Sequence, residues 1–507
     1  MFRSPFSLSL ILLAGTWSWA AAQSAPPGPA PSPVTWPDSP LGRAAQALIE
    51  TINRGDSLGL IRYFEQYGAR DLMLQWTPQR YARMLLKARA QSGGLEVRRV
   101  RDRGNAVRVF TSAKQADRML GIELVAGYRE TDKVAQISLH LMDPAQQQRP
   151  KWPAVRTDAE RIAAIESRIA ELTAADRFSG VVLVARGDSV LVERAVGFSD
   201  QARQLPNTPD TRFMLTSVGK MFAAVAVAQL VESGKLRFDD TVAKVLPEYP
   251  DREAARRITI AQLLTHTAGV PEVFDAPGLN RALPYGSHAE LLKVTVNRPL
   301  LMEPGSHWGY SNGGYATLGA IVERLSGQSY QDYLRSRIFQ PAGMTQGLRP
   351  SNDTATGRAV PYAHFPEVDP LGREPRTPGE QARDGMGARL WAFGGGYGSP
   401  RDLFRFVRAL RNGRLVSRAM VDTLVAGRVP LGPGSGEQYA YGFYSIPIGD
   451  DRVVGHSGSN PGMGMDADVE LLWDRDYTII VLSNYDAPAG VMLAQSIVLL
   501  LAGVEPR

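Results

Sequence analysis

The stretch that decides the fold is Ser217-Val-Gly-Lys220-Met-Phe-Ala-Ala-Val-Ala-Val-Ala-Gln-Leu-Val231, in which a serine and a lysine open an apolar segment. This segment is Ala-rich and apolar on nearly all sides, which is typical of a buried helix, and Gly234 follows as its expected end. Residues at i and i+3 share a helix face, so Lys220 can reach the Ser217 hydroxyl. A hydroxyl is a weak nucleophile until a base takes its proton, and burial lowers the pKa of a lysine enough for that task. Among the lysines of the chain, only Lys220 follows a serine by three positions.

A second motif, Tyr310-Ser-Asn312, lies in a turn-rich loop that leads into a predicted helix. We expect Tyr310 to pass a proton to the leaving group, with its phenolate stabilised by protonated Lys220. Asn312 supplies an amide that can hold a substrate carbonyl and orient Lys220. Taken alone, this motif fits an ordinary Asn-Gly turn beside a core tyrosine equally well.

A third motif, His456-Ser457-Gly458, follows a short apolar run and precedes two predicted strands, 468–473 and 477–482. Gly458 lets a strand edge approach a substrate closely, and the backbone N–H groups of Ser459 and Ser217 would then form an oxyanion hole. We expect His456 and Ser457 to help hold the substrate and the proton network. A glycine-rich hairpin explains this motif in isolation, but chance is a poor explanation for all three motifs in this order.

The three motifs resemble those of the class C β-lactamase-related serine hydrolases, which include penicillin-binding carboxypeptidases, D-aminopeptidases and bacterial esterases. The resemblance runs from about Ser179 to Asn484 and includes three framework segments, 258–269, 339–344 and 394–403. It implies an α/β + α fold of the β-lactamase/transpeptidase type, with an antiparallel sheet flanked by helices and an all-helical subdomain. It also implies an acyl-enzyme on Ser217, with Lys220 and Tyr310 as bases and without a cofactor.

One departure bears on the substrate, which we expect to be a small molecule or a peptide. Penicillin-active members of the family carry Lys at the position of His456, and a histidine is mostly neutral at pH 7. The substitution resembles the esterase and D-aminopeptidase branches, so we expect an esterase or a peptidase-like enzyme. A β-lactamase or D-alanyl-D-alanine carboxypeptidase is the alternative within the class. A non-catalytic penicillin- or peptide-binding protein on the same fold is the alternative from another class.

A different nucleophile is suggested by Val454-Gly-His-Ser457-Gly-Ser459, which resembles the Gly-x-Ser-x-Gly elbow of α/β-hydrolases without its last Gly. Those enzymes order their triad as Ser, acid and His along the chain. No His follows Ser457, so the triad cannot be completed in that order. The chain has no Cys, and its other histidines are scattered, so we predict no metal site: His140, His266, His288, His307 and His364.

The 507 residues are enough for two or three domains, and a net charge of +6 is too small to indicate nucleic-acid binding. Arg3, an apolar stretch and a small-residue site ending at Ala22 predict a signal peptide at 1–22. A Pro-rich linker follows at 23–40. Because there is no Cys to carry a lipid, we expect a periplasmic or secreted protein that is not a lipoprotein. No membrane span is expected after signal cleavage.

Residues 41–145 predict a small α+β domain, in which three helical segments precede four alternating strands. It resembles the NTF2-like fold and shows no acid–base cluster, so we expect a role in packing, oligomerisation or substrate presentation. A second linker, 146–156, is broken by two prolines. The hydrolase domain, 157–507, then opens with a helix at 158–174 and a hairpin at 180–193, and it closes with a helix at 491–501.

Overall fold

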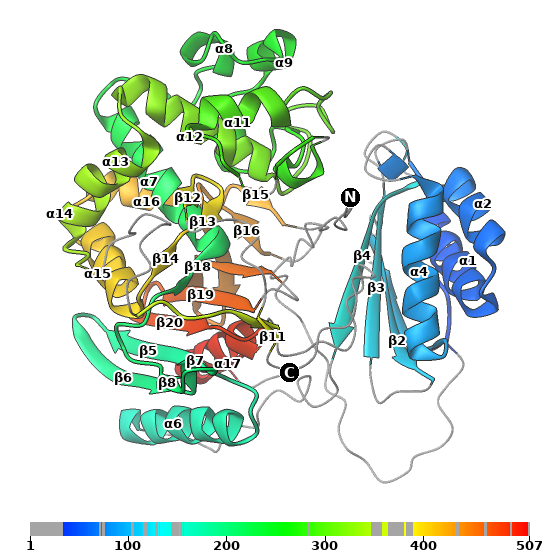
Figure 1. The fold of residues 1–507 in the computed structure, drawn as a ribbon, viewed down its shortest axis with the longest axis horizontal. Coiled ribbons are helices and arrows are strands. Elements are labelled where there is room, and N and C mark those ends of the chain that lie inside the picture. The colour runs from blue at the N-terminus through cyan, green and yellow to red at the C-terminus, as the bar shows by residue number, and fades with distance from the viewer. Residues whose placement is uncertain are drawn as a thin grey trace.

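A computed structural model of the chain describes residues 34–504 (Figure 1). Gaps within this range fall at 70–71, 74–76, 103–105, 115–118, 127–129, 131, 143–151, 153–154, 156, 277, 281–282, 346–356, 364–379, 382–388, 432–435, 461–463 and 487–488. The predicted signal peptide and most of both predicted linkers therefore lie outside the described residues, as does His364. No helix in the described part of the chain is long and apolar enough to cross a membrane.

The larger unit is built on an antiparallel eight-stranded sheet, as the resemblance implied. Its strand order is β15-β16-β17-β18-β19-β20-β5-β6. The β5–β6 hairpin, which comes early in the unit, therefore pairs with β20, which comes late in it. The strands are β15 (Val429–Pro430), β16 (Gln438–Tyr439), β17 (Tyr444–Ile448), β18 (Asp451–Asn460), β19 (Met465–Leu472), β20 (Tyr477–Ser483), β5 (Gly180–Arg186) and β6 (Ser189–Val196).

Both faces of the middle of this sheet are buried, since every residue of β19 and β20 is buried, including the acidic side chains of β19. On one face, Val182 and Val481 pack against α6 (Asp158–Ala174) and α17 (Ala489–Ala502). On the other face, alternate residues of the same strands join a larger core that includes α15 (Pro400–Arg411). The sheet is thus the middle layer of three, with helices above and below it (Figure 1).

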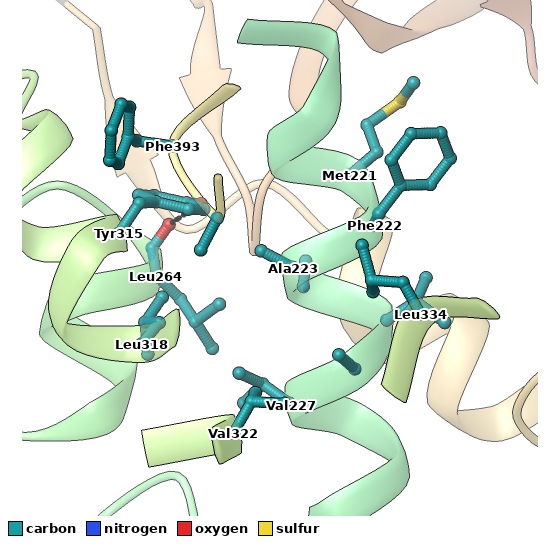
Figure 2. Packing of buried hydrophobic residues seen from close by; sticks show 14 of the residues in the cluster. Met221, Phe222, Ala223, Val227, Leu264, Tyr315, Leu318, Val322, Leu334 and Phe393 are labelled. Carbon is teal, nitrogen blue, oxygen red and sulfur yellow. Dashed lines mark hydrogen bonds between the residues drawn. The ribbon is translucent and has the colours of Figure 1, made fainter. Parts of the chain in front are cut away.

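The helical subdomain is held together around α7 (Gly219–Glu232), whose residues up to Ala228 are all buried. Figure 2 shows Tyr315, Leu318 and Val322 of α12 (Asn312–Ser326) on one side of α7, and Leu334 on the other. The remaining short helices of this region are α8 (Val242–Val245), α9 (Arg252–Arg257), α10 (Ile260–Leu264), α11 (His288–Thr295), α13 (Tyr330–Leu334), α14 (Gln340–Ala342) and α16 (Arg418–Val425). A helix apolar on all sides, as predicted from the sequence, is therefore the centre of the subdomain.

In the described part of the larger unit, four short ribbons lie outside the main sheet, and the two named next contact the segment that carries Ser217. Strand β9 (Phe213–Met214) pairs with β14 (Tyr397–Gly398), and β12 (Leu390–Trp391) pairs with β13 (Gly394–Gly395). The other two ribbons are β7 (Phe198–Asp200) with β8 (Leu205–Pro206), and β10 (Tyr362–Ala363) with β11 (Glu380–Gln381). The glycine-rich segment at 394–398 thus lies beside the chain that carries the candidate nucleophile.

The N-terminal unit has its own apolar core and follows the predicted order of helices and then strands. Its helices are α1 (Pro40–Arg54), α2 (Ser57–Tyr67) and α4 (Pro78–Ser92). They precede an antiparallel sheet of order β1-β2-β3-β4, made of β1 (Leu95–Asp102), β2 (Ala106–Ala113), β3 (Met119–Ala126) and β4 (Val134–Met142). This arrangement confirms an antiparallel α+β unit, whereas its likeness to the NTF2-like fold remains a prediction.

Trp152, in the predicted second linker, packs against the larger unit. Its indole Nε1 donates a hydrogen bond to the backbone oxygen of Ser496 at 3.0 Å, and its ring contacts the core beside α17. The packed part of the larger unit therefore begins at or before Trp152.

Candidate active site

Ser217 lies in a single 3-10 turn, η1 (Thr216–Val218), immediately before α7. The sequence placed Ser217 at the start of the helix itself, and the structure places it one turn earlier. Thr216 has a φ of +47°, which is unusual for a β-branched residue and marks a strained backbone before the nucleophile. Ser217 is half-buried, whereas its neighbours Thr216 and Val218 are buried.

Two glycines make the space for this turn. A Cβ on Gly458 of β18 would lie 2.7 Å from the backbone nitrogen of Ser217, and one on Gly394 would lie 2.5 Å from the backbone oxygen of Thr216. Any side chain at Gly458 would therefore push the strand away from the nucleophile. The third motif thus lies within a strand that touches the first motif directly, and the backbone nitrogen of Ser217 is close to that strand.

The Lys220 side chain is fully buried and reaches Ser217 as predicted. Its Nζ lies 3.1 Å from Ser217 Oγ, 2.8 Å from Asn312 Oδ1 and 2.5 Å from the backbone oxygen of Phe393. Burial lowers the pKa of Lys220 from 10.5 to about 7, although the negative charge of Glu272 opposes this shift. A large fraction of Lys220 is therefore neutral near pH 7.

The neutral amine has a fixed orientation. Asn312 Oδ1 and the Phe393 carbonyl can only accept hydrogen bonds, so each takes one of the two N–H groups of a neutral Lys220. The lone pair that remains points to the third neighbour, Ser217 Oγ. This geometry lets the amine accept the serine proton, which is what a general base must do.

Tyr310 donates its hydroxyl proton to Ser217 Oγ at 2.8 Å, and Lys220 Nζ lies 4.7 Å from the centre of its ring. Burial raises the pKa of Tyr310 well above 10, so its resting form is the neutral phenol. A phenolate stabilised by Lys220⁺, which the sequence analysis expected during proton transfer, is therefore not the resting form. A neutral phenol remains a suitable proton donor to a leaving group.

Asn312, the first residue of α12, is held by Glu272 rather than left open to a substrate. Its Nδ2 lies 3.1 Å from both carboxylate oxygens of Glu272, and its backbone nitrogen donates to Oε2 at 3.1 Å. Because Nδ2 is bound there, Oδ1 must face Lys220. The predicted orienting role of Asn312 thus fits the structure, whereas the amide N–H group expected to hold a substrate carbonyl is already occupied.

His456 is fully buried and belongs to a hydrogen-bond network that also includes His266 and Tyr439. The backbone N–H of Ser311 donates to His266 Nδ1 at 3.0 Å, so His266 carries its proton on Nε2, which lies 3.2 Å from the Tyr439 hydroxyl. That hydroxyl lies 3.0 Å from His456 Nε2, and His456 Nδ1 lies 2.6 Å from the Ser457 carbonyl. Each hydrogen-bond donor in this network has one acceptor only if both histidines are neutral.

The charge states agree with this pattern. Burial lowers the pKa of His266 well below 6.5 and lowers that of His456 to about 3, with the charge of Lys220 adding to both shifts. The centres of the His266 and Tyr310 rings lie 4.2 Å apart, so the hydrogen-bond network packs against the Tyr310 ring through His266. His456 therefore offers no cation to a substrate carboxylate.

Ser457 lies on the other face of β18, because side chains alternate along a strand. It stands opposite Asp468 of β19, and its hydroxyl is hydrogen-bonded to Tyr444. A serine inside a strand is not on the sharp strand-to-helix turn of an α/β-hydrolase, so the structure rules out the nucleophile elbow. Ser459 follows in the same strand, opposite Asp466.

Three groups that contact the candidate site residues escaped the sequence analysis: the Glu272 carboxylate, the Phe393 carbonyl and the Tyr439 side chain. Glu272 comes three residues after a framework segment and carries no motif of its own. The Phe393 carbonyl has no side-chain signal at all. Among the described residues, no group of three or more His, Cys, Asp or Glu side chains is arranged to hold a metal ion.

This arrangement around Ser217 fits a serine hydrolase, and comparisons with known proteins support that class. The model of the Beta-lactamase family matches residues 165–503, and the chain belongs to that family. The match covers the sheet, the helical subdomain and all three motifs, but not the N-terminal unit.

Three relatives show the range of the family. Penicillin-binding protein 4* of Bacillus subtilis is 30% identical over 61% of this chain and 68% of its own length. Esterase EstB of Burkholderia gladioli is 31% identical over 55% of this chain and 78% of its own length. The octameric penicillin-binding protein homologue of Pyrococcus abyssi is 26% identical, with a TM-score of 0.57 over 69% of this chain and 78% of the other.

Proposed function

We propose that the protein hydrolyses neutral carboxylic esters or amides through an acyl-enzyme on Ser217. The observation that carries this proposal is the arrangement around Ser217 Oγ. It has a neutral amine oriented to take its proton on one side and a phenol that donates to it on the other. Family membership supports a serine hydrolase, and the choice of substrate is argued below.

In the first step, Ser217 Oγ attacks the substrate carbonyl carbon while its proton moves to Lys220 Nζ. The carbonyl electrons move onto the oxygen, which the backbone N–H groups of Ser217 and Ser459 would hold. The negative charge of Glu272, relayed through Asn312, favours the protonated lysine that this step creates.

In the second step, the carbon–oxygen or carbon–nitrogen bond breaks and Tyr310 gives its proton to the leaving group. The Tyr310 hydroxyl lies 2.8 Å from Ser217 Oγ, so its proton is within reach of a leaving group beside that oxygen. The proton held on Lys220 then replaces the one that Tyr310 has lost. A water repeats the same steps in reverse order, which releases the acid and restores Ser217.

A neutral substrate follows from the third motif. A β-lactam or a C-terminal peptide presents a carboxylate, which needs a fixed cation to bind well. His456 is buried, is neutral at pH 7 and uses both ring nitrogens within the protein. The Lys of penicillin-active members thus has no substitute at this position, which favours an ester or a neutral amide.

A panel of substrates tests this preference. We expect kcat/KM for a neutral short-chain p-nitrophenyl ester to exceed that for a cephalosporin by about tenfold or more, because the missing charge-assisted hydrogen bond is worth roughly 1.5–3 kcal/mol. A D-amino-acid amide and a D-alanyl-D-alanine peptide complete the panel. Faster turnover of the cephalosporin or the dipeptide would replace the esterase proposal with the β-lactamase or carboxypeptidase alternative. Binding without turnover of any of the four would favour the non-catalytic alternative.

The N-terminal unit is proposed to be dispensable for chemistry, because the described groups around Ser217 come from residues 216–459. We expect a chain that begins at residue 151, and so keeps Trp152, to hydrolyse the activated ester within about tenfold of the full chain. A chain that begins at residue 157 serves as the comparison and should melt several °C lower, since it loses the Trp152 contacts. A folded chain from residue 151 without activity would show that the N-terminal unit helps build the site.

Export and oligomerisation remain proposals from the sequence. The signal peptide at 1–22 predicts a periplasmic or secreted enzyme without a lipid anchor, and the N-terminal unit is a candidate surface for self-association. Cell fractionation of the tagged full-length protein tests the first point. Comparison of the solution masses of the full chain and the chain from residue 151 tests the second.

A further inference from the structure

Glu272 is a buried carboxylate next to the catalytic groups, and the mechanism above does not require it to touch the substrate. It precedes η2 (Val273–Asp275) and is 9% exposed. Besides Asn312, its carboxylate accepts from the backbone N–H of Phe274 at 3.3 Å, and its backbone oxygen accepts from Arg298. The carboxylate is therefore fixed in place from several directions.

Asn312 donates hydrogen bonds to the Glu272 carboxylate from both its side chain and its backbone. Both the side-chain amide and the first backbone N–H of α12 meet the carboxylate, where a negative charge also complements the helix dipole. Gly313 allows this close approach, since a Cβ there would lie 2.1 Å from the backbone oxygen of Pro271. The amide of Asn312 is consequently polarised, with its oxygen turned to Lys220 Nζ at 2.8 Å.

We propose that Glu272 is a positioning residue that sets the basicity of Lys220 through Asn312, and thereby the pH range in which the enzyme works. This inference rests on the proposed function, because it assumes that Lys220 is the base. The Glu272 carboxylate is hydrogen-bonded to Asn312 and Phe274, whereas Ser217 Oγ is hydrogen-bonded to Lys220 and Tyr310. It acts by fixing the Asn312 oxygen and by supplying a negative charge to the protonated lysine.

The other ionisable groups near Lys220 do not supply that charge: Tyr310, Tyr315, His266 and His456. Burial keeps the two tyrosines protonated and the two histidines unprotonated, so all four are neutral at pH 7. Arg298, which binds the backbone of Glu272, is positive and opposes its effect. Glu272 is thus the anionic group that raises the pKa of Lys220 against the effect of burial.

The test is the pH dependence of kcat/KM for a neutral ester in Glu272→Gln, with Glu272→Met as a second neutral variant. Activity should rise with pH as Lys220 loses its proton, so the acidic limb reports that pKa. Without the negative charge the pKa of Lys220 falls, so the acidic limb of the pH profile should shift to lower pH by about one unit. The plateau should fall about tenfold, because Asn312 loses charge-assisted hydrogen bonds.

Two controls separate charge from structure. Glu272→Asp keeps the charge, so its limb should stay near that of the wild type even if its plateau falls. Asp239→Asn removes a fully exposed charge and should change neither quantity. If both neutral variants lower the plateau of kcat/KM but leave the acidic limb at the same pH, the inference is overturned and Glu272 is a purely structural residue.

The rate at which a fluorophosphonate labels Ser217 gives a readout that does not depend on the substrate. It should show the same downward shift of the acidic limb in Glu272→Gln. Wild-type protein that is not labelled at Ser217 would overturn the proposed function itself. Labelling at Ser217 with identical limbs in wild type and Glu272→Gln would overturn only the role of Glu272.

Discussion

Replacement of Ser217 by Ala is expected to lower kcat/KM for an activated ester by about 10⁴-fold or more, because no acyl-enzyme can form. The Oγ is the point at which the Lys220 amine and the Tyr310 hydroxyl meet, at 3.1 and 2.8 Å. Without it, neither group has a reacting atom to act on. A fluorophosphonate should label the wild type on the peptide that contains Ser217, and mass spectrometry should find no label on the variant.

The matched control is Ser233→Ala, at the exposed end of the same helix. It should keep wild-type activity, and both variants should melt within a few °C of the wild type, since Ser217 is only half-buried. Label found on Ser457 instead of Ser217 would contradict this assignment. It would also conflict with the position of Ser457, which lies inside strand β18 opposite Asp468.

The contact between Ser217 and Lys220 could be predicted from the sequence because it depends on local structure. The i and i+3 spacing of Ser217 and Lys220 depends only on the helical geometry that follows, and an Ala-rich segment such as 221–231 can hardly be anything but a buried helix. The predicted strands 468–473 and 477–482 correspond to β19 and β20, because the strand pattern of each segment is also a local signal. Even the pKa of Lys220 could be given a direction, since a lysine at the start of a fully apolar helix must be buried.

The remaining groups depend on contacts between distant parts of the chain, which no local pattern records. The Phe393 carbonyl reaches Lys220 because the β12–β13 ribbon lies against the nucleophile turn, 173 residues away in sequence. Glu272 meets Asn312 across 40 residues, and His266 meets Tyr439 across 173. The sequence analysis also expected His456 to help hold the substrate, whereas its side chain is buried and hydrogen-bonded to Tyr439.

The phenolate expected for Tyr310 illustrates the same limit in electrostatic terms. From the motif alone, a nearby Lys220⁺ would lower the pKa of the phenol. In the structure the burial of both groups dominates, so the lysine tends to lose its charge and the tyrosine tends to keep its proton. A neutral pair is the arrangement that follows, and the proposed mechanism uses its lysine as the base and its tyrosine as the acid.

Lys220 should be irreplaceable even by another cation. If Lys220 served only as a positive charge, Lys220→Arg would keep much of the activity, because an arginine is always protonated. As a base it must offer a lone pair to Ser217, which an arginine cannot do. We therefore expect Lys220→Arg and the neutral Lys220→Met to lose activity alike, by about 10³-fold or more in kcat/KM.

The pH profile distinguishes the two roles further. In the wild type, kcat/KM should fall about tenfold for each pH unit below about 7, because Lys220 gains a proton as the pH falls through its pKa. In Lys220→Met the residual activity should lose this limb entirely, while Ser217 can still be labelled slowly. A Lys220→Arg enzyme within tenfold of the wild type, or an unchanged limb in Lys220→Met, would show that another group takes the serine proton. The Tyr310 hydroxyl, 2.8 Å from Ser217 Oγ, would then be the group to test as the base.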